Sequence, residues 1–166
     1  NLLIFISYFS LITISIIGYG LLFLRLLNIK IDAYNFGYVG LLGIYILLIY
    51  SYLSNLIIAH FELHNLLVLI FGITAFIFST YKKCSRYKKE YIFTFVVFIL
   101  LFISLMQFKN HDDFSYYHFP YTYYLTQQSF HFGIGQFNHG FRTPSSIFYL
   151  NSLFYLPFAK FYLFNF

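Results

Sequence analysis

The sequence predicts an all-α, polytopic transmembrane helical bundle, and three observations support this prediction. Of the 166 residues, 60% are hydrophobic and 9% are charged, and the mean hydropathy is +0.73. Soluble domains carry about 25% charged residues, so this chain has too few charges to cover a globular surface. Long apolar stretches approach the roughly 20 residues that a helix needs to cross a bilayer. The basic residues gather between these stretches. The composition therefore argues against a soluble enzyme, a disordered chain and a nucleic-acid-binding domain.

Four stretches without Asp, Glu, Lys or Arg are predicted to span the membrane, at about residues 2–24, 37–59, 65–80 and 91–108. The first is too long for the core of a signal peptide and no basic residue precedes it, so we expect it to remain as a span. In the second, Gly37, Gly40 and Gly43 have a small-residue spacing that predicts a helix–helix contact. The single cysteine, Cys84, excludes an intramolecular disulfide.

The short loops predict the orientation of the chain. Residues 81–90 contain five Lys or Arg, the segment after the first span adds Arg25 and Lys30, and the turn at 60–64 has none. Cytoplasmic loops of membrane proteins carry an excess of these residues. We therefore expect an integral protein of the bacterial inner membrane, with loop 81–90 in the cytoplasm and the N-terminus and residues 109–146 outside. We expect the turn at 60–64 to be solvated.

The last third of the chain differs in composition from the part before it. Residues 109–146 are polar and aromatic, and the sequence predicts an extracytoplasmic loop there with short interfacial helices. Residues 147–166 are apolar again, and we expect a helix from about Pro144 to Leu156 and then the start of a further, truncated span. Because the chain also begins with Asn1, we expect it to be an N-terminal fragment of a longer membrane protein.

Adjacent carboxylates at the start of this loop are the first candidate site. Asp112 and Asp113 follow the fourth stretch directly. One carboxylate can act as a general base, and the other can hold a divalent cation such as Mg²⁺ or Mn²⁺. His111 and His118 are further candidate ligands, since imidazole suits Mn²⁺ or Zn²⁺. The alternative is structural: Asp112 caps the helix that follows it.

A second polar cluster predicts a phosphate-binding site. Thr143 followed by Pro144 is typical of a helix start, which would place Arg142 beside unpaired backbone N–H groups that bind anions. The guanidinium fork of Arg142 matches a phosphate. His139 and Ser145 are candidate additional donors. The alternative is that Arg142 reaches lipid headgroups or pairs with the carboxylates.

Tyrosines are frequent between these two clusters. Residues 116–124 contain five of them, which is typical of an interfacial aromatic belt. A surface on which sugar rings stack is the alternative.

The order of these motifs resembles a family. Apolar spans that include NFGYVGLLGIYILLIYSYL are followed by HDDFSYYHFPYTYYL and then by NHGFRTPSSIFYLNSLFYLP. This pattern is similar to the N-terminal part of a family of bacterial multi-pass envelope proteins, which in turn resembles the C-fold glycosyltransferases. Those enzymes use lipid-phosphate-linked sugars and carry an acidic motif in their first large outer loop. The resemblance implies that Asp112 and Asp113 match this motif, although here four spans precede it.

The resemblance implies glycosyl transfer in envelope glycan assembly from a polyprenyl-phosphate-linked sugar. The expected partners are the lipid bilayer and that sugar-lipid, with no nucleic acid. Three alternatives remain at this point: a polymerase or ligase of lipid-linked glycans, a transporter or flippase component, and a non-catalytic membrane scaffold. A transporter is expected to place ionisable residues within its spans, whereas the four predicted spans have no Asp, Glu, Lys or Arg.

Overall fold

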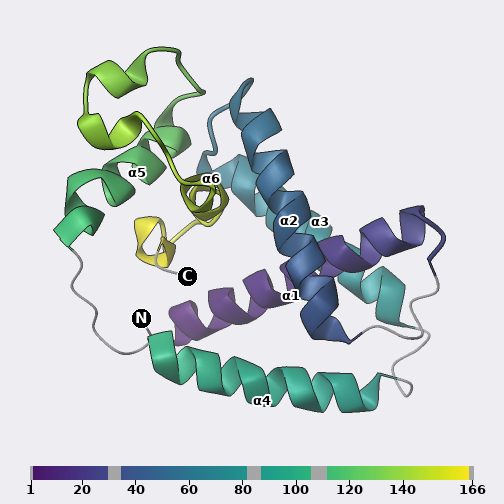
Figure 1. Ribbon diagram of the computed structural model, residues 1–166. Coiled ribbons are helices and arrows are strands. Elements are labelled where there is room, and N and C mark those ends of the chain that lie inside the picture. The colour runs from purple at the N-terminus through teal and green to yellow at the C-terminus, as the bar shows by residue number, and fades with distance from the viewer. Residues whose placement is uncertain (1, 30–34, 82–86, 106–111, 165–166) are drawn as a thin grey trace. The chain divides into compact units, whose positions relative to one another are not determined.

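The computed structural model describes residues 2–29, 35–81, 87–105 and 112–164, and within these ranges it is helical with no β-strand (Figure 1). The predicted all-α architecture is therefore confirmed. The chain divides into two compact units. The first contains residues 1–47 and 69–108, and the second contains residues 48–68 and 109–166. Helices α2 and α3 each contribute residues to both units.

Four long helices account for the apolar stretches: α1 (Leu2–Leu26), α2 (Phe36–Asn55), α3 (Glu62–Thr80) and α4 (Lys88–Leu105). Within the described residues, α1, α2 and α3 are long and apolar enough to cross a membrane. The chain is thus a multi-pass membrane protein. Helix α4 forms where the fourth span is predicted, but its 18 residues begin with Lys88, Lys89 and Glu90, so its role as a span stays a prediction.

The second helix is shorter than its apolar run suggests. Helix α2 ends at Asn55, not at Ala59. The amides of Ile57 and Ile58 both donate to the carbonyl of Ser54, which turns the chain. The Asn55 carbonyl accepts from the distant Phe130 amide at 2.9 Å. Hydropathy cannot detect this stop, because residues 56–59 are as apolar as the helix before them.

Close helix crossings organise the first unit. A side chain at Gly18 would collide with the carbonyl of Gly72, and one at Gly43 would collide with the carbonyl of Ile16. These glycines let the backbones of α1, α2 and α3 approach each other, as small residues do between membrane helices. The contact predicted from the glycine spacing is confirmed at Gly43. At Gly40 an added Cβ would have ordinary van der Waals room, with its nearest neighbour 3.8 Å away.

An aromatic cluster holds the start of α2 in the same unit. Phe36 is 3% exposed and packs against Phe76, Tyr87 and Tyr91, with ring centroids 5.4–5.9 Å apart. The Phe36 amide donates to Glu90 Oε2 at 3.3 Å. A carboxylate at a helix N-terminus is stabilising because of the helix dipole, so the acid of α4 supports the first turn of α2.

The second unit joins the α2–α3 turn to the last part of the chain. It contains the π-helix η3 (Phe114–His118), α5 (Phe119–Gln127), the single 3₁₀ turns η4 (Ile134–Gln136) and η5 (His139–Phe141), α6 (Ser146–Ser152), and the 3₁₀ turn η6 (Phe161–Leu163). Its hydrophobic core is built from Tyr121, Leu125, Phe148 and Tyr149. The hydroxyls of Tyr121 and Tyr149 lie 2.9 Å apart. Tyr121 is 1% exposed, so the tyrosine-rich segment is not simply an interfacial belt.

Pro120 explains the switch from π-helix to α-helix. Proline has no N–H, so the carbonyl four residues before it, that of Tyr116, loses its usual helical donor. Asn138 Nδ2 donates to that carbonyl instead, at 3.4 Å. The Phe119 amide bonds to the Phe114 carbonyl in the wider π register. The helix predicted after Asp112 therefore continues through Pro120, although with altered hydrogen bonding.

The end of the chain differs from the prediction in two ways. Helix α6 begins at Ser146 with Ser145 as its N-cap, whose hydroxyl accepts from the Ile147 amide at 3.4 Å. The predicted cap at Thr143 is wrong, because residues 143–145 are not helical and the first helical turn begins three residues after Thr143. The expected further span over 147–166 is also not formed in the described residues. After α6, Phe158 and Lys160 have positive φ, and the chain turns back on itself.

Candidate functional site

A cavity of about 230 Å³ lies in the second unit between η3, α5, α6 and the end of the described chain. Its lining residues are Phe114, His118, Thr122, Ile147, Phe148, Asn151 and Phe164. Four of these are apolar and three carry polar groups. Ligand sites in proteins typically combine apolar walls with a few placed polar groups, so this cavity is the candidate binding site of the unit.

The polar lining residues are held by their neighbours. The His118 ring lies 4.4 Å from the Tyr117 ring and 4.9 Å from the Phe148 ring, centroid to centroid. Asn151 is 8% exposed, and its Nδ2 donates to the Phe164 carbonyl at 2.7 Å. Asn151 Oδ1 is buried and has no hydrogen-bond partner among the described residues. A buried acceptor without a donor lowers the stability of the fold by about 1–3 kcal/mol. The unpaired Asn151 Oδ1 is therefore an unusual feature of this unit.

The acidic pair immediately precedes the cavity in the chain. Asp112 and Asp113 are both exposed, and Phe114, which lines the cavity, is the next residue. Asp113 precedes η3 without a side-chain cap bond, and its Oδ2 accepts from Tyr117 at 3.5 Å. Asp112 already lies in a helical turn, and the described residues offer its carboxylate no partner. The predicted cap by Asp112 is therefore wrong, and the carboxylate is exposed to solvent.

The candidate metal ligands that the structure describes do not form a metal site by themselves. His111 lies outside the described residues. Within the described ranges, no three His, Cys, Asp or Glu residues are grouped so that they could hold a metal ion. Asp112, Asp113 and His118 are therefore not a ligand set by themselves, and a divalent cation stays a prediction.

Arg142 is exposed, but its position relative to the start of α6 differs from the prediction. Because α6 starts at Ser146, Arg142 does not lie beside a helix N-terminus. Its Nε donates to the Gly135 carbonyl at 3.4 Å. The side chains of His139 and Thr143 are exposed as well, whereas Ser145 serves as the cap. No ion pair links Arg142 to the acidic pair in the part of the chain that the structure describes.

The acidic pair and the Arg142 cluster belong to one unit. Turn η5, which directly precedes Arg142, contacts η3. Gly140 of η5 packs so closely on the Tyr117 ring that a side chain there would collide with it. Asn138 bonds across the same contact to Tyr116. The structure therefore joins two clusters that the sequence presents as separate motifs.

Sequence analysis missed a buried polar network around His60. His60 was expected in a solvated turn, but it is 0% exposed. Its Nε2 lies 2.9 Å from Ser54 Oγ, and its Nδ1 lies 2.6 Å from Ser152 Oγ. The expectation of a solvated turn is wrong for this residue, because α6 covers the ring. The only sequence signal is a group of polar residues at the ends of two apolar stretches.

Hydrogen-bond distances favour one tautomer of His60. The Ser152 hydroxyl donates to the Tyr149 carbonyl at 2.7 Å, whereas the competing bond from the Ser54 hydroxyl to the Ser51 carbonyl is long, at 3.4 Å. This difference favours a proton on Nδ1 that Ser152 accepts, with Nε2 accepting from Ser54. The His64 ring stacks on His60 with centroids 5.2 Å apart and planes 4° apart. Burial, together with the nearby His64, lowers the pKa of His60 to about 3.

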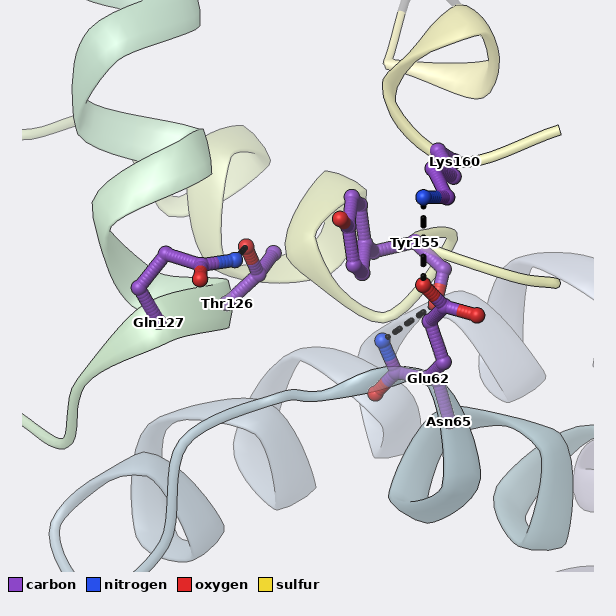
Figure 2. Close-up of polar contacts among 6 residues, drawn as sticks. All are labelled: Glu62, Asn65, Thr126, Gln127, Tyr155 and Lys160. Atoms are coloured by element: carbon purple, nitrogen blue, oxygen red, sulfur yellow. Dashed lines mark hydrogen bonds and ion pairs between the residues drawn. The ribbon is translucent and has the colours of Figure 1, made fainter. Parts of the chain in front are cut away.

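Asn65 connects this network to the end of the chain (Figure 2). Its Nδ2 donates to the carbonyls of His60, Ser152 and Tyr155 at 2.7, 2.8 and 3.0 Å. Its Oδ1 lies 2.9 Å from His64 Nδ1. Asn65 is 1% exposed, so one amide group fixes the α2–α3 turn to the segment after α6.

Comparisons with known proteins add no relative. No protein-family model matches the chain, and neither the curated proteins nor the solved structures contain a match. The site is therefore interpreted from its own residues.

Stability is expected to fall in mild acid because of His60. The unfolded chain binds a proton near the ordinary pKa of 6.5, whereas folded His60 stays neutral down to about pH 3. Stability is thus full above pH 6.5 and falls by about 1.4 kcal/mol per pH unit below it. Thermal unfolding of the protein in detergent at pH 7.5 and pH 5 measures this loss, about 2 kcal/mol. In His60→Gln, the share of this stability loss that comes from His60 should disappear. An equal loss of stability between pH 7.5 and pH 5 in both proteins would contradict the assignment.

Proposed function

We propose that this protein takes part in envelope glycan assembly by transferring a sugar from a polyprenyl-phosphate carrier. The observation that carries this proposal is the placement of an exposed acidic pair directly before a partly apolar cavity, in a multi-pass membrane protein. A membrane-embedded donor presents a sugar, a phosphate and a lipid together. The second unit offers a cavity, an exposed arginine and helices that enter the bilayer.

In this proposal the carboxylate of Asp112 or Asp113 is the general base. It accepts the proton of the acceptor hydroxyl while that oxygen attacks the anomeric carbon of the donor. The bond between the anomeric carbon and the phosphate oxygen breaks, and the carrier phosphate leaves with its electron pair. Arg142 neutralises the charge on this phosphate through its guanidinium fork. The exposure of both carboxylates suits proton exchange with solvent after each transfer.

The second unit is proposed to lie on the outer face of the bacterial inner membrane. The distribution of Lys and Arg in the sequence predicts that the α2–α3 turn and residues 109–146 lie on the same side of the membrane. Hydrogen bonds between His60 and Leu125 and between Asn55 and Leu125, at 2.9 and 3.1 Å, join these two segments. Such bonds require both segments to lie on one side, which supports the proposed topology.

Thiol labelling tests this orientation. With Cys84 replaced by serine, Ser115→Cys is expected to react with a membrane-impermeant reagent in intact cells, because Ser115 is exposed in the second unit. In the unaltered chain, Cys84 should react only after lysis, since it belongs to the basic loop at 81–90. Labelling of Cys84 in intact cells would reverse the orientation.

Carrier binding tests the role of Arg142. Arg142→Ala is expected to weaken binding of a short-chain polyprenyl phosphate by about ten- to a hundredfold, since a charge-assisted contact contributes roughly 1.5–3 kcal/mol. Arg142→Lys should weaken it less, because it keeps the charge and loses the fork. Titration of the purified protein in detergent measures both affinities. Lys160→Ala, which removes an exposed cation of the same unit, is the control. Equal affinity of wild type and Arg142→Ala would refute the phosphate contact.

A further inference from the structure

We infer that the cavity lined by Phe114, His118, Thr122, Ile147, Phe148, Asn151 and Phe164 binds a single sugar ring of the lipid-linked donor. This inference rests on the proposed function and names the part of the donor that the cavity holds. None of its lining residues except His118 was a candidate from the sequence.

The size of the cavity selects the ligand class. Sites for drug-sized ligands measure roughly 300–1,000 Å³, whereas this cavity measures about 230 Å³. It has room for one ring and not for an oligosaccharide or a lipid chain. The ring must therefore carry its lipid outside the cavity, as a carrier-linked monosaccharide does.

The walls match the two kinds of surface on a sugar. Phe114, Phe148 and Phe164 present apolar rings, against which the C–H face of a pyranose can pack. Thr122 and Asn151 present a hydroxyl and an amide among these rings. A purely apolar ligand would leave the Thr122 hydroxyl without water, which is unfavourable.

Asn151 adds an independent indication of a polar ligand. Its Nδ2 is used by the Phe164 carbonyl, but its buried Oδ1 has no donor in the described residues. Nearly all buried polar atoms in proteins have a partner, and an exception points to a missing water or ligand. A sugar hydroxyl is a donor of the required kind. Because Oδ1 is itself closed to water, it accepts this bond only after a small rotation of the Asn151 side chain toward the cavity that the residue lines.

The position of the cavity also fits the proposed chemistry. Asp113 and Phe114 are consecutive, so their Cα atoms are about 3.8 Å apart. Phe114 lines the cavity and neither aspartate does, so the inference places the ring one residue along the chain from the carboxylates proposed to activate the acceptor. The exposed side chain of Ile147, at 43%, makes this lining residue the one that can be enlarged with least disturbance to the core.

The test compares carrier lipids with and without a sugar. The probes are short-chain polyprenyl phosphate and the same lipid linked to glucose, mannose, galactose or N-acetylglucosamine, titrated into the detergent-solubilised protein. We expect wild type to bind at least one sugar-lipid at least tenfold more tightly than the bare phosphate. Ile147→Trp should fill the cavity and abolish this preference, whereas the control Phe132→Trp, at an exposed position outside the cavity lining, should keep it. Thr122→Val, which replaces a hydroxyl by a methyl group of similar size, should reduce the preference two- to tenfold even if the tryptophan variant fails to fold.

The outcomes separate the two proposals. If wild type binds all lipids equally, or if folded Ile147→Trp keeps the sugar preference, the cavity does not hold the sugar, while carrier binding by the protein stands. If no lipid binds to wild type, the proposed function itself falls. Loss of the preference in Ile147→Trp and its decrease in Thr122→Val, with unchanged affinity for the bare phosphate, support the assignment.

Discussion

Asp112→Asn and Asp113→Asn are expected to reduce the glycan product, and the double variant is expected to abolish it. The amide cannot accept the proton of an attacking hydroxyl, so the general base is lost. The fold should be unaffected, because both side chains are exposed and their one side-chain hydrogen bond among the described residues is from the Tyr117 hydroxyl to Asp113, at 3.5 Å. Exposed substitutions of this kind change stability by about 0.5 kcal/mol or less. The measurement is glycan product per amount of membrane-inserted protein in cells of the native host.

A matched control lies one turn further along the same segment. Ser115→Ala removes an exposed hydroxyl whose contact is the Asp112 carbonyl at 3.3 Å, and it should leave product unchanged. If all three Asp variants, including the double, make normal product, the acidic pair has no catalytic role. If the variants vanish from the membrane while Ser115→Ala does not, the pair is structural and the catalytic assignment is again refuted.

Asn65→Leu is expected to cause the largest loss of stability among the substitutions considered. Leucine has a similar volume but cannot donate, so three buried carbonyls lose the amide that they share. The Ser152 carbonyl keeps the Tyr155 amide as a donor at 3.3 Å, so the carbonyls of His60 and Tyr155 are left without a donor among the described residues. Each such group costs about 1–3 kcal/mol, so we expect a loss of about 2–6 kcal/mol. The midpoint of thermal unfolding in detergent should fall by roughly 4–24 °C.

Glu62→Gln is the control, because Glu62 connects the same two segments (Figure 2). Its Oε1 lies 3.9 Å from Lys160 Nζ, and both side chains are more than one-third exposed. Exposed ion pairs contribute little, with a median of about 0–1 kcal/mol. The unfolding temperature of Glu62→Gln should therefore stay close to that of wild type. A similar shift in both variants would show that Asn65 contributes no more than a surface contact.

The sequence alone determined the helical class and the three apolar helices that are long enough to cross a membrane, while the fourth span stays a prediction. Apolar runs of about 20 residues without charge have few other stable structures, since a bilayer requires every backbone polar group to be satisfied within the helix. The Gly37–Gly43 spacing likewise predicted a close helix contact, which forms at Gly43. These features depend on local composition, so a single sequence was sufficient for them. Orientation and glycosyl transfer were also predicted from the sequence and stay predictions.

Only the tertiary structure decided where the polar residues of the second unit go. His60 and Ser152 are 92 positions apart, and Asn65 and Tyr155 are 90 apart. No local sequence pattern predicts such long-range hydrogen bonds. The sequence alone therefore predicts a solvated turn at His60. The helix start at Ser146, with Ser145 rather than Thr143 as its cap, likewise appears only in the packed chain, where α6 buries residues 148–152. The cavity also depends on tertiary packing. Its walls come from η3, α5, α6 and the end of the chain, and it forms only where these distant segments pack together.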